Sequence, residues 1–331
     1  MSLLTAISVD AVRARGSITG TDVIALRQAF FEGGNASRSD VETLIALNAT
    51  CHPQDASWVD CFVEILTDHV VNQAKPEGYL TLENAEWLLL QIAPNGRVVT
   101  KSELELLVNV LDKARWSPES LVAFALDQVK WAVIENTGPL RDGKSLIPGV
   151  IDEAEVELIK RILYAFGGDD NVSISRIEAD ILFEIDAATA GRNNAESWPD
   201  LFVKAIANCL MTASGYASPS REQALSRETW LERRASGSSD NVDRNTGGVL
   251  SAYRQQSPME RAIAALERQK IEIVTSEHVS VADASWLTAR IGRNGTATPN
   301  ELALMSFILS HNTTIAPELE ALVSRLHLAA A

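Results

Sequence analysis

The chain contains 331 residues, of which 44 are acidic and 29 basic, so that its net charge is −15. This length predicts two domains, and an apolar content of 46% excludes a chain that is disordered throughout. The negative charge argues against a general nucleic-acid-binding protein, because the phosphates would repel it.

The N-terminal residues do not have the pattern of a secretory signal, since Asp10 and Arg13 interrupt the only apolar stretch there. No window of about 18 residues is apolar enough to predict a membrane span. Cys51, Cys61 and Cys209 are odd in number and show no CxxC spacing. We therefore expect a cytoplasmic protein with three unlinked thiols.

Three blocks of sequence recur in the same order in the two halves of the chain. The matching segments are 37–40 and 175–178, 57–63 and 197–203, and 84–104 and 283–302. The second pair reads SWVDCFV against SWPDLFV. Because the order is kept, the sequence predicts a tandem duplication of one domain.

The repeated blocks define the predicted domain organisation. It consists of an N-terminal lead at 1–17, a first helical repeat domain at 18–135, a Gly/Pro-rich linker at 136–149, and a second helical repeat domain at 150–328 with an insertion at 217–275.

Every repeated segment has the apolar spacing and the start signals of a helix. A capping box combines Ser or Thr at the N-cap with an acidic residue or Gln three positions later, and each satisfies a free backbone N–H of the other. The candidate boxes are Ser37/Asp40, Ser57/Asp60, Thr100/Glu103, Ser175/Glu178, Ser197/Asp200, Ser257/Glu260, Ser280/Asp283 and Thr298/Glu301. No alternating strand pattern of comparable length competes, so the predicted class is all-α, built from helix-loop-helix units.

Residues 138–145 read GPLRDGKS and match the phosphate-binding pattern GxxxxGK[ST]. In a nucleotide-binding protein a strand leads into this loop and a helix begins at its lysine. Here residues 118–135 have helical periodicity, and Pro148 follows too soon for a helix to begin at Lys144. The context favours a connecting loop, and we expect no nucleotide and no other organic cofactor.

The segment 167–178 has the spacing of a calcium-binding EF-hand loop. Ligand positions three, five, seven, nine and twelve are occupied by Asp169, Asn171, Ser173, Ser175 and Glu178. Gly167 and Val172 depart from the pattern at positions one and six, where Asp and Gly are usual. Two interpretations stay open: a site for Ca²⁺ or Mg²⁺, or a capping box formed by Ser175 and Glu178 without metal.

Two further loops, at 95–103 and 294–301, contain an Asn-Gly turn, an apolar residue and then an acidic helix start. Together with 167–178 they resemble EF-hand-like helix-loop-helix pairs, and the chain also resembles the tellurite-resistance TerB-like helical family. The resemblance implies an all-α fold whose loops respond to a divalent cation or another ligand.

Other reactive or aromatic residues have structural interpretations. A transition-metal site could be assembled from Cys51, His52, Cys61, Asp68 and His69. Cys61 corresponds to Leu201 in the second half, however, which favours packing. Trp58, Trp87, Trp198 and Trp286 recur at matching places and are expected in the core. Trp116 and Trp131 have no Trp counterpart and are better candidates for the surface.

The insertion differs from the rest of the chain in charge. Residues 217–270 contain nine basic and seven acidic side chains, a charge of +2, whereas the rest of the chain carries −17. A basic segment with helical apolar spacing lies within the insertion, and its candidate partner-binding residues are Arg254, Met259, Arg261, Ile263, Leu266 and Arg268.

No GxSxG, HExxH or Cys-His signature of catalysis is present. The sequence therefore predicts a non-enzymatic helical interaction or adaptor protein with a protein partner, because repeated helical units form extended binding surfaces. The alternative is a divalent-cation-responsive or ligand-sensing module that uses the EF-hand-like loops.

Overall fold

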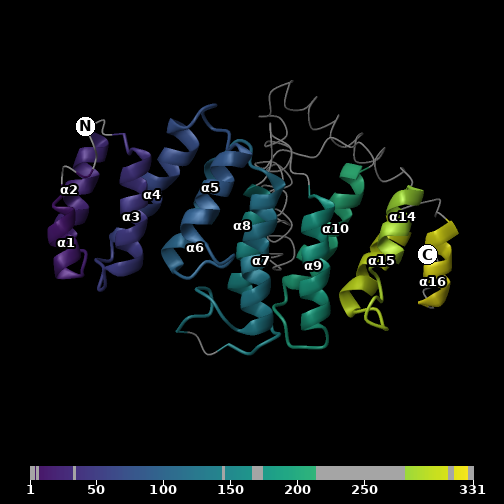
Figure 1. The fold of residues 1–331 in the computed structure, drawn as a ribbon. Coiled ribbons are helices and arrows are strands. Elements are labelled where there is room, and N and C mark those ends of the chain that lie inside the picture. The colour runs from purple at the N-terminus through teal and green to yellow at the C-terminus, as the bar shows by residue number, and fades with distance from the viewer. Residues whose placement is uncertain are drawn as a thin grey trace, which may run out of the picture. The chain divides into compact units, whose positions relative to one another are not determined.

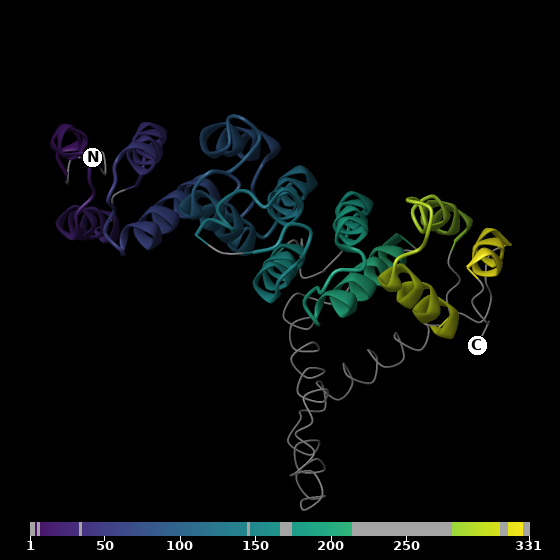
Figure 2. The ribbon, with the colours of Figure 1, turned by 90° about the horizontal axis from the view of Figure 1, so that it is seen from below.

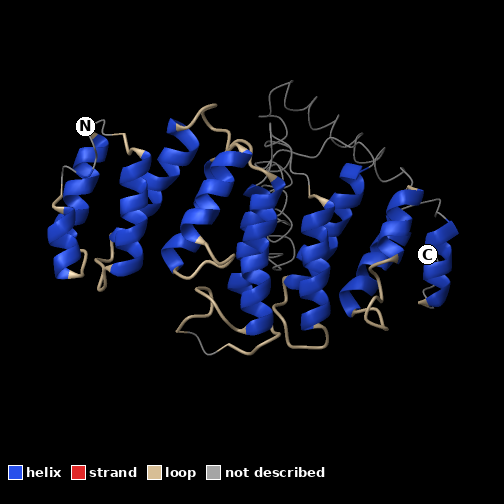
Figure 3. Cartoon of the chain, in the orientation of Figure 1, coloured by secondary structure: helices blue, strands red, loops and turns tan. Residues whose placement is uncertain are grey.

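The computed structural model describes residues 4, 7–32, 35–143, 146–165, 174–213, 280–311 and 317–326. Within these residues the chain forms 13 α-helices and one short π-helix, and no β-strand (Figure 3). The predicted all-α class is confirmed.

Contacts between residues divide the chain into two compact units, Met1–Asp169 with Asp180–Trp198, and Asp170–Ala179 with Pro199–Ala331. The predicted linker at 136–149 lies inside the first of these units.

The first unit contains nearly all of the helices before α10 (Figure 1). They are α1 (Val9–Arg15), α2 (Gly20–Phe31), α3 (Arg38–Thr50), α4 (Trp58–Thr67), the π-helix η2 (Asp68–Gln73), α5 (Leu82–Ile92), α6 (Lys101–Lys113), α7 (Glu119–Glu135), α8 (Glu153–Ala165) and α9 (Arg176–Thr189), whose first turn is assigned to the second unit.

Helices two apart in the chain pack against each other in this unit: α2 contacts α4, α4 contacts α6, and α6 contacts α8. Leu26, Phe62, Leu107 and Ile159, one from each of these helices, are completely buried. Burial of such apolar side chains is the main favourable contribution to folding.

The second unit contains α10 (Trp198–Ala213, without Trp198 itself), α14 (Val281–Thr288), α15 (Pro299–His311) and α16 (Pro317–Arg325). Helix α14 packs against α16, as Figure 2 shows. Phe202, Leu287, Leu304 and Leu319 are completely buried and form its core.

Four pairs of consecutive helices, α2–α3, α5–α6, α8–α9 and α14–α15, start their second helix in the same way. The N-cap N–H donates to the acidic side chain three residues later, whose own N–H donates to the N-cap hydroxyl oxygen. The N-cap and acidic residues are Ser37 and Asp40, Thr100 and Glu103, Ser175 and Glu178, and Thr298 and Glu301. These four predicted capping boxes are confirmed.

Two other predicted boxes are wrong. The Ser57 hydroxyl donates to Asp55 at 2.6 Å, and α4 has no side-chain cap at its N-terminus. The Ser197 hydroxyl donates to Glu153. In both cases the hydroxyl binds a carboxylate that lies outside its own helix.

The remaining predicted starts have different outcomes. The Asp283 N–H donates to Ser280 Oγ at 3.2 Å, as expected, whereas Ser257 and Glu260 lie outside the described residues. A box that was not predicted starts α8, where the Glu155 N–H donates to Asp152 Oδ1 at 2.8 Å.

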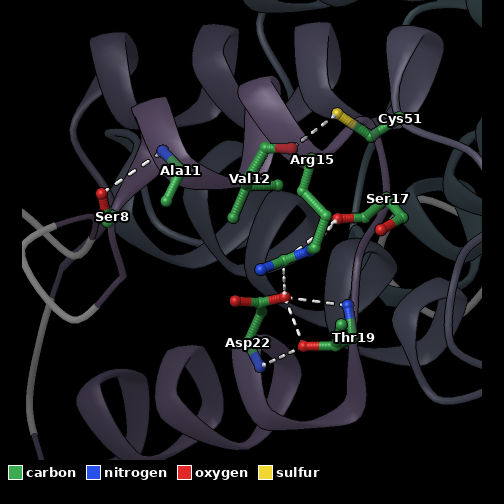
Figure 4. Close-up of polar contacts among 8 residues, drawn as sticks. All are labelled: Ser8, Ala11, Val12, Arg15, Ser17, Thr19, Asp22 and Cys51. Carbon is green, nitrogen blue, oxygen red and sulfur yellow. Dashed lines mark hydrogen bonds and ion pairs between the residues drawn. The ribbon is translucent and has the colours of Figure 1, made fainter.

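Residues 1–17 were predicted only as a lead, but they contain helix α1. Side-chain bonds connect the C-terminal end of α1 to the residues that follow it (Figure 4). Ser8 caps α1 by accepting the Ala11 N–H at 3.3 Å. At the other end Arg15 pairs with Asp22 and donates to the carbonyl oxygen of Ser17 at 3.1 Å. Asp22 in turn forms a further unpredicted capping box with Thr19.

None of the helices in the described ranges combines the length and the apolar character that crossing a lipid bilayer requires.

Candidate functional site

The predicted metal loop is described only at its C-terminal end. Asp169, Asn171 and Ser173 lie outside the described residues, whereas Ser175 and Glu178 are described. The Ser175 N–H donates to Glu178 Oε2 at 2.7 Å, and the Glu178 N–H donates to Ser175 Oγ at 3.3 Å. The capping interpretation of these two residues therefore has direct geometric support, and the metal site stays a prediction.

Across the described ranges no group of three or more His, Cys, Asp and Glu side chains is placed to hold a metal ion. Cys51 and Cys61 are buried, and burial raises the pKa of the Cys61 thiol to about 11. The His69 ring shares a hydrogen bond with the carbonyl oxygen of Ala36 at 2.8 Å and lies edge-on to Trp87. Cys61 and His69 thus contribute to packing, which agrees with the repeat argument from sequence.

The segment with the phosphate-loop pattern is described up to Gly143, whereas its Lys144 and Ser145 lie outside the described residues. Helix α7 leads into it and Asn136, in left-handed conformation, ends this helix. Arg141, at the centre of the pattern, is buried and forms a two-pronged ion pair with Glu155, from Nε to Oε1 at 2.7 Å and from Nη2 to Oε2 at 2.8 Å.

Arg141 has five N–H groups, and five acceptors surround it. Besides the two oxygens of Glu155, they are the side-chain oxygen of Asn136 at 3.0 Å and the carbonyl oxygens of Ile147 at 2.9 Å and Val150 at 2.6 Å. The arginine therefore fastens the connection between α7 and α8 and has no donor left for a phosphate.

The predicted partner-binding residues, Arg254, Met259, Arg261, Ile263, Leu266 and Arg268, lie outside the described residues, as does the whole insertion at 217–275.

A set of exposed apolar side chains, together with a half-buried tryptophan and an ion pair, lies on the C-terminal half of α7 and on two segments that are hydrogen-bonded to it. We call it the α7-end cluster, and its members are Arg97, Val99, Trp131, Ile134, Glu135 and Ile147. Val99, Ile134 and Ile147 are exposed by 76%, 39% and 65%.

Trp131 is the aromatic member of this cluster and lies on α7, one turn before Glu135. The guanidinium of Arg97 lies 4.7 Å from the centre of its ring. Arg97 also forms a two-pronged ion pair with Glu135, one turn further along α7, at 2.6 and 2.8 Å. An arginine held on both sides in this way orients the indole and keeps its own side chain extended.

The neighbouring loop brings Ile147 to the same end of α7, because the Gly149 N–H donates to the carbonyl oxygen of Val133 at 2.8 Å. Exposed apolar side chains beside Trp and Arg are typical of protein-binding surfaces, where these two residue types supply much of the binding energy.

Comparison with family models, with curated proteins and with solved structures gives no match for this chain.

Sequence reasoning identified part of the α7-end cluster. The absence of a Trp counterpart indicated that Trp116 and Trp131 lie at the surface, and Trp116 is exposed while Trp131 is half-buried. The pairing of Arg97 with Trp131 was missed. The two residues are separated by helix α6 and most of α7, so no local spacing pattern connects them.

Proposed function

We propose that this protein is a non-enzymatic interaction or adaptor protein built from two duplicated helical halves. The observation that carries the proposal is the α7-end cluster, in which apolar side chains remain exposed around an indole ring that an ion-paired arginine holds in place. The partner is a protein that presents apolar side chains to Trp131. The three thiols support a cytosolic location.

Matching bonds in the two halves support the duplication. The Trp58 indole N–H donates to Asn48 Oδ1 at 3.0 Å, and the Trp198 indole N–H donates to Asp186 Oδ1 at 3.3 Å. In the sequence alignment of the halves these residues correspond to each other.

Stacked arginines repeat as well. Arg38 lies 4.6 Å from the ring centre of Trp87, and Arg176 lies 5.7 Å from that of Trp286. Each arginine follows the N-cap serine of a second helix, and each tryptophan lies on the first helix of the next pair.

The bonding of buried polar side chains also supports a structural interpretation over an enzymatic one. Buried Asp40, Glu103 and Glu301 cap helices, Gln128 accepts the Val98 N–H at 3.0 Å, and Arg141 is bonded to its neighbours at all five N–H groups. Catalysis requires side chains that converge on a substrate, and these are engaged in holding the fold.

The test is differential capture followed by titration with a purified partner. The wild-type chain is compared with Ile134→Asp in the cluster and with the control Ile24→Asp, which makes the same substitution at an exposed isoleucine of α2. We expect a partner that is kept by Ile24→Asp and bound roughly thirty-fold more weakly by Ile134→Asp, the size of a hot-spot effect of about 2 kcal/mol.

A second part of the experiment uses a variant in which residues 235–270 are deleted. A partner lost only by this deletion would place the contact on the insertion, with Arg254, Met259, Arg261, Ile263, Leu266 and Arg268, and away from α7. A set of captured proteins that no variant changes would contradict the interaction function.

A further inference from the structure

We infer that the four acidic residues in the capping boxes of these helix pairs do not need a divalent cation. The acidic residue at the place of the last calcium ligand acts as a backbone cap in each pair, and Glu178 is included. This goes beyond the proposed interaction function and does not depend on it.

The carboxylate oxygen in all four pairs is at hydrogen-bond distance from a backbone nitrogen of its own N-cap. The distances are 2.9 Å from Ser37 N to Asp40, 3.0 Å from Thr100 N to Glu103, 2.7 Å from Ser175 N to Glu178 and 2.9 Å from Thr298 N to Glu301. In a calcium loop the residue at position twelve turns both of its oxygens toward the cation. Here one oxygen of each carboxylate is directed at the backbone.

These carboxylates are buried, with exposures of 6% or less for Asp40, Glu103, Glu178 and Glu301. A buried carboxylate is stable only if hydrogen-bond donors or positive charge compensate the loss of water. The free N–H groups and the positive end of the helix dipole supply this compensation at a helix N-terminus. The same compensation would otherwise have to come from a cation.

The fourth pair shows most directly how a bond within the chain takes the place of a metal bridge. The Gly292 N–H donates to Glu301 Oε2 at 3.1 Å, and the Thr298 N–H donates to the same oxygen. Counting Glu301 as position twelve makes Gly292 position three. In a calcium loop these two positions are joined through the ion, and here they are joined by a hydrogen bond.

The donor set of the fourth loop does not fit a cation that takes 6–8 oxygen ligands. In the fourth loop, positions one and three are Arg290 and Gly292, which offer no carboxylate. The Arg290 guanidinium lies 4.5 Å from the ring centre of Trp286 and donates to its carbonyl oxygen at 3.2 Å. A positive side chain thus occupies the position where a calcium loop begins with Asp.

Substitution by Gln and by Ala separates a cap from a metal ligand, because Gln supports a capping box but is neutral. The variants are Glu103→Gln, Glu103→Ala, Glu178→Gln and Glu178→Ala in the full chain, with Glu86→Ala on the exposed side of α5 as the control. We expect the Ala variants to raise the unfolding equilibrium constant roughly three- to ten-fold. The Gln variants should stay close to the wild type.

The second measurement is titration with CaCl₂ and with MgCl₂ by calorimetry, together with thermal unfolding in EDTA and in each salt. We expect no binding heat and the same unfolding temperature with divalent salt as in EDTA at matched ionic strength. A binding heat for either ion that disappears in Glu178→Gln would overturn the inference. So would a Glu178→Gln variant as unstable as Glu178→Ala. Because the Gln variants are expected to fold, both outcomes can be measured.

Discussion

Arg141 shows how a single side chain can determine the structure of a connecting segment. Its charge is almost completely buried, since both Arg141 and Glu155 have side-chain exposures of 1%. A buried ion pair is tolerated only when hydrogen bonds satisfy both groups, and here five donors meet five acceptors. In the described part of the linker, 136–143 and 146–149, Arg141 therefore bonds to both ends of the connection.

Replacing Arg141 by Met leaves the Glu155 carboxylate buried without its partner. We expect Arg141→Met to lower the free energy of unfolding by roughly 3–5 kcal/mol. The double variant Arg141→Met/Glu155→Gln should recover part of this loss, because Gln removes the charge and still caps α8. Urea unfolding measures both, and a double variant no more stable than the single one would contradict this account.

Cys61 illustrates an effect of burial on pH dependence. Burial raises the pKa of its thiol from 9.0 to about 11 in the folded chain. The unfolded chain loses this proton at lower pH than the folded chain, so the contribution of the thiol to stability falls as the pH rises from about 9 to about 11.

Between pH 9 and pH 11 we expect the free energy of unfolding to fall by up to about 3 kcal/mol through Cys61 alone. The substitution Cys61→Ala should remove this pH dependence. The variant should also be less stable at neutral pH, because the shorter side chain leaves a small cavity. Unfolding free energies at pH 8, 9 and 10 for the two proteins give the difference in slope. Parallel curves would show that the thiol does not titrate in this way.

At the scale of elements, hydrogen bonds to Asn48 join three helices of the first unit. Its side-chain oxygen accepts the indole N–H of Trp58 at 3.0 Å and the hydroxyl of Ser102 at 3.0 Å, so that α3 is connected to both α4 and α6. Helix α4 has no side-chain cap, and this bond fixes its first turn from the side.

Asn48→Leu keeps the size of the side chain and removes the acceptor. It should lower the free energy of unfolding by about 2–3 kcal/mol, because the buried indole N–H of Trp58 and the Ser102 hydroxyl both lose this acceptor. Asn48→Asp keeps an oxygen at this position, as Asp186 does in the second half, and should lower it less. Equal losses in urea unfolding would show that the acceptor is not what matters.

Helix starts were predictable from sequence wherever the cap is local. Ser37, Thr100, Ser175 and Thr298 bond to residues only three positions away, so a short pattern contains all the information that decides the bond. Ser57 does not follow this pattern, because its hydroxyl donates to Asp55, two residues before it.

At the scale of the whole molecule, the net charge of −15 opposes compaction of the chain through repulsion between like charges. Ion pairs reduce this repulsion locally, for example between Arg161 on α8 and Asp112 on α6 at 2.6 Å. Dissolved ions screen the repulsion between exposed charges.

Added salt should therefore stabilise the folded chain. We expect the urea midpoint to rise between 0.05 and 0.3 M NaCl, concentrations over which the screening length falls from about 14 to about 6 Å. A midpoint that falls with salt would mean that the ion pairs contribute more than the general repulsion.

The sequence by itself determined the helical class and the helix starts whose caps are local, because these depend on neighbours within a few residues along the chain; the correspondence between the halves stays a prediction from sequence. Tertiary structure alone decided where Arg141 points, which indole Arg97 covers and which apolar side chains stay exposed near α7. These outcomes depend on segments that lie far apart in the sequence, and packing brings them together only in the folded chain. The physical difference is the distance along the chain between the interacting residues. A helix cap joins residues within one turn, whereas the exposed surface depends on how all the helices pack.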